Sequence, residues 1–212
     1  MNKKESRAIL IAKKLKSMYP RARVFLNHSN SFELLVAVIL SAQCTDKKVN
    51  EVTKSLFKKY KTINDYVLAG KTEKTRRVFE KDILQTGFYR AKTKNILKTA
   101  EIIKKQYKGK VPKTMEELIT LPGVGRKTAN IILESAFGVV VGIPVDTHVF
   151  RLARVLGLSS AHTPEKVERD LCALLPRRYW AKFSYRLISY GREYCPARRH
   201  DHTRCPLSHI GV

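Results

Sequence analysis

Two residues that can do covalent and acid–base chemistry, Lys127 and Asp146, stand in segments of unusual composition. Lys127 belongs to the run Leu-Pro-Gly-Val-Gly-Arg-Lys-Thr-Ala-Asn (residues 121–130), and Asp146 to Val-Asp-Thr-His-Val (residues 145–149). The amine of a lysine is a nucleophile only when it is neutral, and positive potential from Arg126 and a helix N-terminus favours that form. A carboxylate can stabilise a developing positive charge and can move protons. These residue types permit nucleophilic chemistry assisted by a carboxylate.

Each residue also has an ordinary structural interpretation. A lysine taken alone is more often a solvated surface residue. An aspartate directly before Thr147 suits the N-cap of a helix, a role that leaves one carboxylate oxygen for other contacts. Only the combination of Lys127, Asp146 and the adjoining glycine-bearing turn favours catalysis.

The charge balance indicates a polyanionic partner. The chain has 42 Lys and Arg against 18 Asp and Glu, a formal net charge of +24 and a pI near 10.1. Nucleic acid is the first candidate, because each phosphate neutralised by Lys or Arg releases counterions and adds affinity. A membrane surface is the alternative, but residues 1–6 show no signal or myristoylation pattern, and the apolar stretch 136–145 is too short to span a bilayer. We therefore expect a soluble, intracellular protein. The expected setting is the bacterial cytoplasm, in association with the nucleoid, and the expected oligomeric state is a monomer.

Gly123 and Gly125 lie between two helical patterns and predict a helix, a tight turn and a second helix. Thr114 followed three residues later by Glu is typical of a capping box, which predicts a short helix over residues 115–121. Glycines let a phosphate approach the main chain, and the first turn of the next helix presents unpaired N–H groups. The turn therefore suits a nucleic-acid backbone, although two glycines can also form nothing more than a tight connection.

Apolar residues recur at helical spacing through most of the chain, and no window shows sustained strand alternation, so the predicted fold class is all-α. Residues 32–40 are almost wholly apolar, which predicts a helix buried on all sides. A one-sided stripe contains Ile96, Leu97, Ala100 and Ile103. Further helices are predicted over the ranges 10–19, 148–156, 164–175 and 180–190.

The run around Lys127, followed by the segment around Asp146, resembles the helix-hairpin-helix and the Gly/Pro-rich loop of the endonuclease III family, and the similarity extends from Ser31 to Leu207. It implies two helical domains with a DNA-binding cleft between them.

The six-helix domain that carries the hairpin is expected over residues 24–138. The second helical domain is expected from both chain ends, residues 1–23 and 139–212.

The resemblance also implies a base excision repair DNA glycosylase with AP lyase activity, in which Lys127 is the nucleophile and Asp146 its carboxylate partner. Attack of the lysine at C1′ releases the damaged base and leaves a Schiff base, whose iminium acidifies the 2′ position and permits β-elimination of the 3′ phosphate. One lysine thus accounts for both activities. The implied partner is double-stranded DNA with a damaged base or an abasic site.

Such an enzyme must extrude the target nucleotide and fill the space that it leaves. The run at residues 39–46 resembles the family segment whose glutamine enters the DNA helix, which indicates Gln43. Gly87-Phe-Tyr-Arg resembles a Gly-x-Tyr turn whose middle residue wedges between bases, which indicates Phe88. The alternatives are a helix-capping amide for Gln43 and a core aromatic for Phe88.

The remaining DNA contacts implied by the resemblance are those of Gly123, Gly125, Arg126 and His148. Adenine glycosylases of the superfamily usually lack the hairpin lysine and carry a catalytic glutamate near the first motif. This chain has the lysine and no such glutamate, so the resemblance implies oxidised pyrimidines as substrates.

The tail departs from the family pattern. Most relatives end in four cysteines, spaced Cys-x6-Cys-x2-Cys-x5-Cys, that hold a 4Fe-4S cluster. The corresponding residues here are Cys195, His202, Cys205 and Gly211. With two thiolates missing, we predict that no cluster is bound and that the protein has no cofactor. Zinc is the alternative, through Cys195, His202, Cys205 and His209 with His200 in reserve.

Two other functions stay open at this point. A non-catalytic DNA-binding module would need the hairpin and the charge but neither Lys127 nor Asp146. A related glycosylase for another lesion, such as a mismatched thymine, would share every motif, because lesion choice depends on pocket shape.

Overall fold

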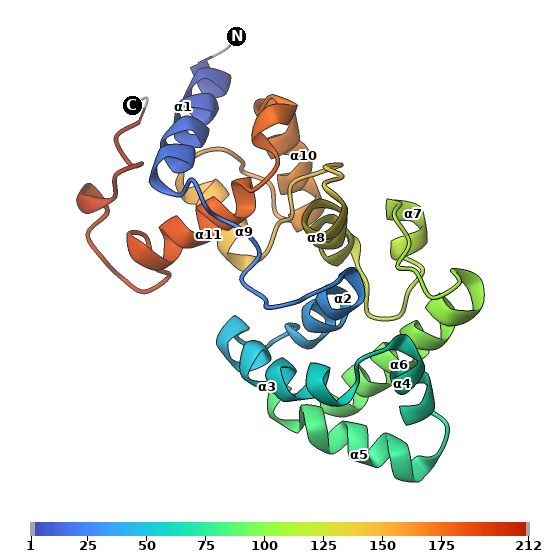
Figure 1. Ribbon diagram of the computed structural model, residues 1–212. Helices are drawn as coiled ribbons and strands as arrows, with labels where there is room; N and C mark the ends of the chain where they lie inside the picture. Colours follow the sequence, from blue (N-terminus) through green and yellow to red (C-terminus); the bar gives the residue numbers. More distant parts are fainter. Residues whose placement is uncertain (1–2, 211–212) are drawn as a thin grey trace. The chain divides into compact units, whose positions relative to one another are not determined.

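The computed structural model describes residues 3–210, and all regular secondary structure in that range is helical, as the sequence predicts (Figure 1). The chain forms two compact units. One contains residues 25–138, and the other combines residues 1–24 with residues 139–212. Among the described residues, no helix is both long enough and apolar enough to cross a bilayer.

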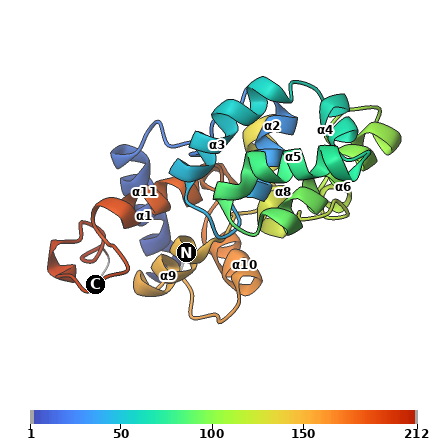
Figure 2. The same ribbon diagram turned by 90° about the horizontal axis from the view of Figure 1, so that it is seen from below.

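The unit of residues 25–138 is built around one buried helix. Its elements are α2 (Ser31–Leu40), α3 (Asp46–Lys59), α4 (Ile63–Ala69), α5 (Glu73–Ile83), the 3₁₀ turn η1 (Leu84–Thr86), α6 (Tyr89–Gln106), α7 (Met115–Leu118) and α8 (Arg126–Phe137). Helix α2 packs against α3, α6 and α8 (Figure 2), and Leu34, Leu35 and Leu40 are fully buried. The prediction of a helix buried on all sides is confirmed.

A cluster of four aromatic rings, one of them on α2, extends this core to α4 and α5. The ring of Tyr66 lies 5.0 Å from Phe32, 5.4 Å from Tyr60 and 5.8 Å from Phe79, measured between centroids, and most of these pairs meet edge to face. Edge-to-face packing places the positive rim of one ring on the negative face of another. The cluster holds α4 and α5 to the rest of the unit.

The second unit comprises α1 (Lys3–Met18), α9 (Thr147–Val155), α10 (Pro164–Leu174), the 3₁₀ turn η2 (Arg177–Tyr179), α11 (Phe183–Glu193) and the 3₁₀ turn η3 (His202–Arg204). Helix α11 packs against both α1 and α9. Gly191 of α11 permits the close approach to α9, because a Cβ atom there would lie 2.7 Å from Leu152 Cδ1.

Several predicted helix boundaries are wrong, among them the start of the first helix, which begins at Lys3 rather than near Leu10. Helix α11 begins at Phe183 rather than near Trp180, because Lys182 adopts a left-handed conformation (φ 62°) that breaks the helix. The short helix before the hairpin ends at Leu118 rather than Leu121, and the intervening residues already belong to the turn.

Candidate functional site

The hairpin turn is held by α6. Thr99 Oγ1 donates a hydrogen bond to the carbonyl of Pro122 (3.1 Å), and Gly123 has a φ of 80°, a conformation that glycine adopts without strain. A Cβ atom on Gly123 would lie 2.9 Å from Asn95 Nδ2. The backbone angle therefore favours glycine at position 123, and a side chain there would also displace that of Asn95.

Helix α8 begins at the exposed end of this turn. Gly125 is its N-cap and supplies no side chain, so the N–H groups of the first turn have no side-chain acceptor from the cap. Arg126 and Lys127 occupy the first turn and are both exposed. The N–H groups of this first turn, the positive end of the helix dipole and two cations are features that favour an anion as a ligand. The Lys127 amine is accessible to a large ligand.

Asp146 caps α9. Its Oδ1 accepts a hydrogen bond from the backbone N–H of Val149 (2.8 Å), and the residue is half-buried. The N-cap interpretation is therefore correct in structural terms, and the cap engages one carboxylate oxygen. His148, in the first turn of the same helix, is also half-buried.

Gln43 and Phe88 share an uncommon backbone geometry. Gln43 lies in the turn between α2 and α3 with a φ of 53°, and Phe88 lies directly before α6 with a φ of 46°. Both are exposed, Phe88 by 65%. Phe88 is thus no core aromatic, and Gln43 caps neither helix, because Ser41 and Thr45 hold those positions. Left-handed conformations of such residues cluster at functional sites.

A buried lysine links these two turns, and the sequence analysis missed it. Lys92 Nζ donates to the carbonyl oxygens of Leu40 (2.8 Å) and Thr86 (2.7 Å), the residues from which the chain leads to Gln43 and Phe88. Lys92 is 4% exposed, and burial lowers the pKa of its ammonium group. The sequence pattern that could have predicted this burial is spacing, because Lys92 lies about one helical turn before Ile96, the first residue of the apolar stripe of α6.

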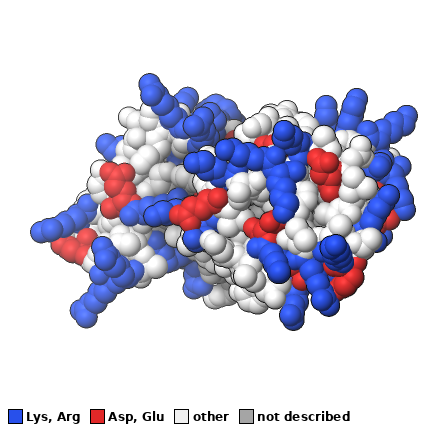
Figure 3. Space-filling model, turned by 60° about the horizontal axis from the view of Figure 1, so that its bottom comes forward, with Lys and Arg blue, Asp and Glu red and all other residues white. Residues whose placement is uncertain are grey.

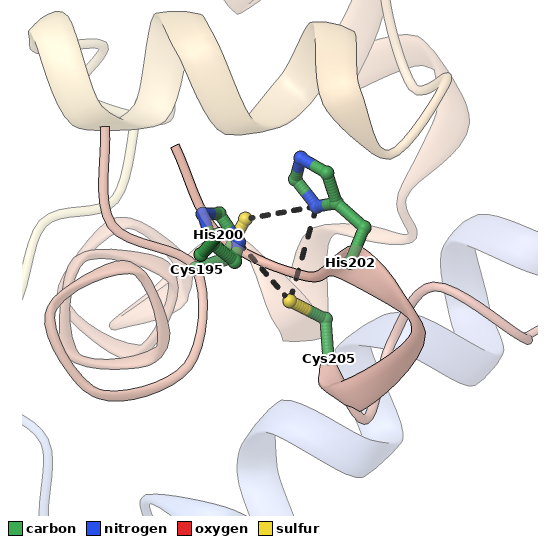
Figure 4. Close-up of side chains that lie close together, drawn as sticks. All are labelled: Cys195, His200, His202 and Cys205. Atoms are coloured by element: carbon green, nitrogen blue, oxygen red, sulfur yellow. Dashed lines mark hydrogen bonds between the residues drawn. The ribbon is translucent and has the colours of Figure 1, made fainter. Parts of the chain in front are cut away.

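The expectation that the tail holds no cofactor is wrong. One donor atom from each of Cys195, His200, His202 and Cys205 lies within 4.8 Å of the others, and the four side chains converge (Figure 4). The group is placed to bind a metal ion. His200, held only in reserve in the sequence analysis, replaces His209 in this group. Gly211 lies outside the described residues.

Both cysteines of this group are buried. Cys205 Sγ donates to the carbonyl of Tyr194 (3.1 Å), and burial, with Cys195 close by, raises the pKa of the Cys205 thiol. Arg151 of α9 donates to the carbonyl oxygen of Cys195 and places a second guanidinium nitrogen 3.8 Å from its sulfur.

Basic side chains predominate over acidic ones on the face shown in Figure 3. Together with the net charge of +24, this surface favours electrostatic binding to a polyanion. Binding of this kind to a nucleic acid depends little on the nucleotide sequence.

Residues 36–177 match the model of the HhH-GPD superfamily base excision DNA repair proteins, so the chain is a helix-hairpin-helix protein of base excision repair. Endonuclease III of Synechocystis sp. is 45% identical over 210 residues, which cover 99% of this chain and 94% of that protein.

Two solved structures, a non-covalent endonuclease III–DNA complex and a trapped endonuclease III–DNA covalent intermediate, each match with a TM-score of 0.89 and 41% identity. Each match covers 99% of this chain and 95% of the other. The chain belongs to the endonuclease III family. It is a DNA-binding enzyme, a base excision repair glycosylase with AP lyase activity.

Proposed function

We propose that Lys127 is the nucleophile of this glycosylase and lyase, that Asp146 assists it, and that the substrates are oxidised pyrimidines in duplex DNA. The observation that carries the proposal is the position of Lys127, exposed in the first turn of α8 directly after the glycine turn. A phosphate seated on that turn brings a deoxyribose within reach of the lysine side chain.

The reaction follows from a neutral amine at position 127. The amine forms a bond to C1′ as the bond from C1′ to the base breaks, and opening of the sugar gives an iminium ion. Loss of a proton from C2′ then expels the 3′ phosphate, and hydrolysis of the imine regenerates the lysine. Arg126 and the N-terminus of α8 place positive potential beside this amine.

Asp146 is proposed to stabilise the positive charge that develops on the sugar and to help move protons. Its cap hydrogen bond uses Oδ1, which orients the carboxylate and leaves Oδ2 for this role. The cap hydrogen bond thus holds the Asp146 side chain in a fixed orientation, which a catalytic group requires.

Gln43 and Phe88 are proposed to enter the DNA helix where the nucleotide is extruded. Both side chains project from strained, exposed turns, and an aromatic ring replaces stacking lost on extrusion. Lys92 supports this role, because one ammonium group fixes the main chain ahead of both turns.

The glycine turn and Arg126 are proposed to hold phosphates near the lesion, with His148 as a further contact. The proposed setting is the bacterial cytoplasm, on the DNA of the nucleoid.

Borohydride trapping tests the proposal, because only a Schiff base is reduced to a stable protein–DNA adduct. We expect an adduct with duplexes that carry thymine glycol or an abasic site and none with undamaged duplex. A non-catalytic DNA-binding module would give no adduct with any duplex. A panel of lesion-bearing duplexes that includes a mismatched thymine tests the substrate class. Faster release of the mismatched thymine than of oxidised pyrimidines would show that the protein is a glycosylase for that mismatch.

A further inference from the structure

We infer that the C-terminal loop binds a single zinc ion in tetrahedral geometry, through two thiolates and two imidazoles, those of Cys195, His200, His202 and Cys205. The ion would occupy the place at which family relatives hold an iron–sulfur cluster.

The spacing of the donor atoms fits one ion. With Zn–S bonds of about 2.3 Å and Zn–N bonds of about 2.0–2.1 Å, the ligand atoms of a tetrahedral site lie about 3.3–3.8 Å apart. Cys205 Sγ lies 3.4 Å from His200 Nε2, and His202 Nδ1 lies 3.9 Å from each sulfur. All the donor atoms lie within 4.8 Å of one another, so small side-chain shifts bring them onto one tetrahedron.

The hydrogen bond on the far side of His200 supports the same assignment. His200 Nδ1 lies 2.9 Å from the carbonyl oxygen of Arg198, a distance at which the ring N–H donates to that oxygen. This bond fixes the tautomer in which Nε2 carries a lone pair, and Nε2 is the atom that faces Cys205. Metal-binding histidines usually have such a partner on the other ring nitrogen.

His209 has the opposite arrangement. Its Nε2 lies 2.9 Å from the carbonyl oxygen of Thr203, to which it can only donate, and it stands outside the group of four. The structure thus distinguishes two histidines that the sequence spacing alone treats as alternatives.

The chemistry of the donor set also favours zinc. Two thiolates balance the charge of Zn²⁺, so the centre would carry no net charge, and Arg151 places a guanidinium nitrogen 3.8 Å from the sulfur of Cys195. A 4Fe-4S cluster normally needs one thiolate ligand on each iron. Its four ligand atoms also lie further apart than the four donor atoms that surround a single ion. The residues present fit that cluster less well than they fit one ion.

Metal analysis of the full chain, purified without metal-affinity chromatography, tests the inference. Elemental analysis is expected to find about one zinc per chain and no stoichiometric iron. Cys205→Ser and His200→Ala are expected to lose the zinc, whereas the matched control His209→Ala is expected to keep it. Circular dichroism at the helical band reports whether each variant is folded.

A second measurement does not depend on the variants. Native protein stripped of metal and loaded with Co²⁺ is expected to show the visible absorption of tetrahedral cobalt with thiolate ligands. Iron with acid-labile sulfide in the native protein would overturn the inference. So would a native protein that neither contains nor takes up a stoichiometric divalent ion, or a site that survives His200→Ala and is lost in His209→Ala.

Discussion

The ammonium group of the buried Lys92 lies 2.8 Å from the carbonyl oxygen of Leu40. That contact joins the start of α6 to the end of the most buried helix of its unit. A charged side chain is retained in such a place only when its hydrogen bonds are satisfied, and Lys92 satisfies a second one at Thr86.

Replacement of Lys92 by methionine should therefore destabilise the unit. The apolar variant keeps most of the side-chain volume but leaves two carbonyl groups without a donor, which costs about 1–3 kcal/mol of unfolding free energy for such a buried group. Urea denaturation measures the loss. The exposed Lys94, two residues further along α6, provides the matched control, and Lys94→Met should change stability little. Equal stability of the two variants would show that the Lys92 contacts contribute nothing.

The same lysine predicts a pH dependence. Because burial lowers the pKa of Lys92 below its ordinary 10.5, the folded protein binds fewer protons than the unfolded chain over the pH range just below that value. Stability rises with pH wherever the unfolded state binds more protons. The unfolding free energy of the native protein, measured relative to Lys92→Met, should thus increase as the pH rises through this window. A difference that is flat across the window would refute the shift.

The contrast between the two hairpin glycines gives another prediction. Gly123→Ala forces a side chain into a left-handed conformation, which costs about 1–2 kcal/mol, and also crowds Asn95. Gly125 has a φ of −93°, and a Cβ there meets nothing within 4 Å. Gly125→Ala should therefore change the thermal midpoint much less than Gly123→Ala does. The reverse order would mean that the turn geometry is misassigned.

The two roles of Asp146 can be separated by substitution. Asparagine caps a helix about as well as aspartate, so Asp146→Asn should keep native stability, whereas Asp146→Ala should lose about 1 kcal/mol. Neither variant has a carboxylate, and both should release the base about 10²–10⁴ times more slowly in single-turnover assays. Native rates in Asp146→Asn would leave Asp146 with the capping role alone.

Local patterns predicted much of the fold. The apolar run of α2 had one interpretation, because a helix without a polar face must be buried, and the glycine turn predicted the helix pair around it. The end of α7 and the start of α11 were misplaced, since each depends on a backbone conformation, such as that of Lys182, that no side-chain pattern records.

The sequence could single out candidate site residues only where a distinctive run of residues surrounds them, and the roles of those candidates stay predictions. Lys127 and Asp146 stand in distinctive runs, but the burial of Lys92 depends on packing between elements far apart in the sequence. The choice of His200 over His209 depends on how the loop folds back from α11, through a contact with the Arg198 carbonyl that spacing does not encode.

The central claim is that the Lys127 amine becomes bonded to deoxyribose, and peptide mapping of the borohydride-trapped complex tests it directly. Proteolysis and mass spectrometry of the native protein trapped on an abasic duplex should place the sugar remnant on Lys127. Lys127→Gln should still bind the duplex but give no adduct. A remnant on any other residue, or an undiminished adduct with Lys127→Gln, would contradict the account.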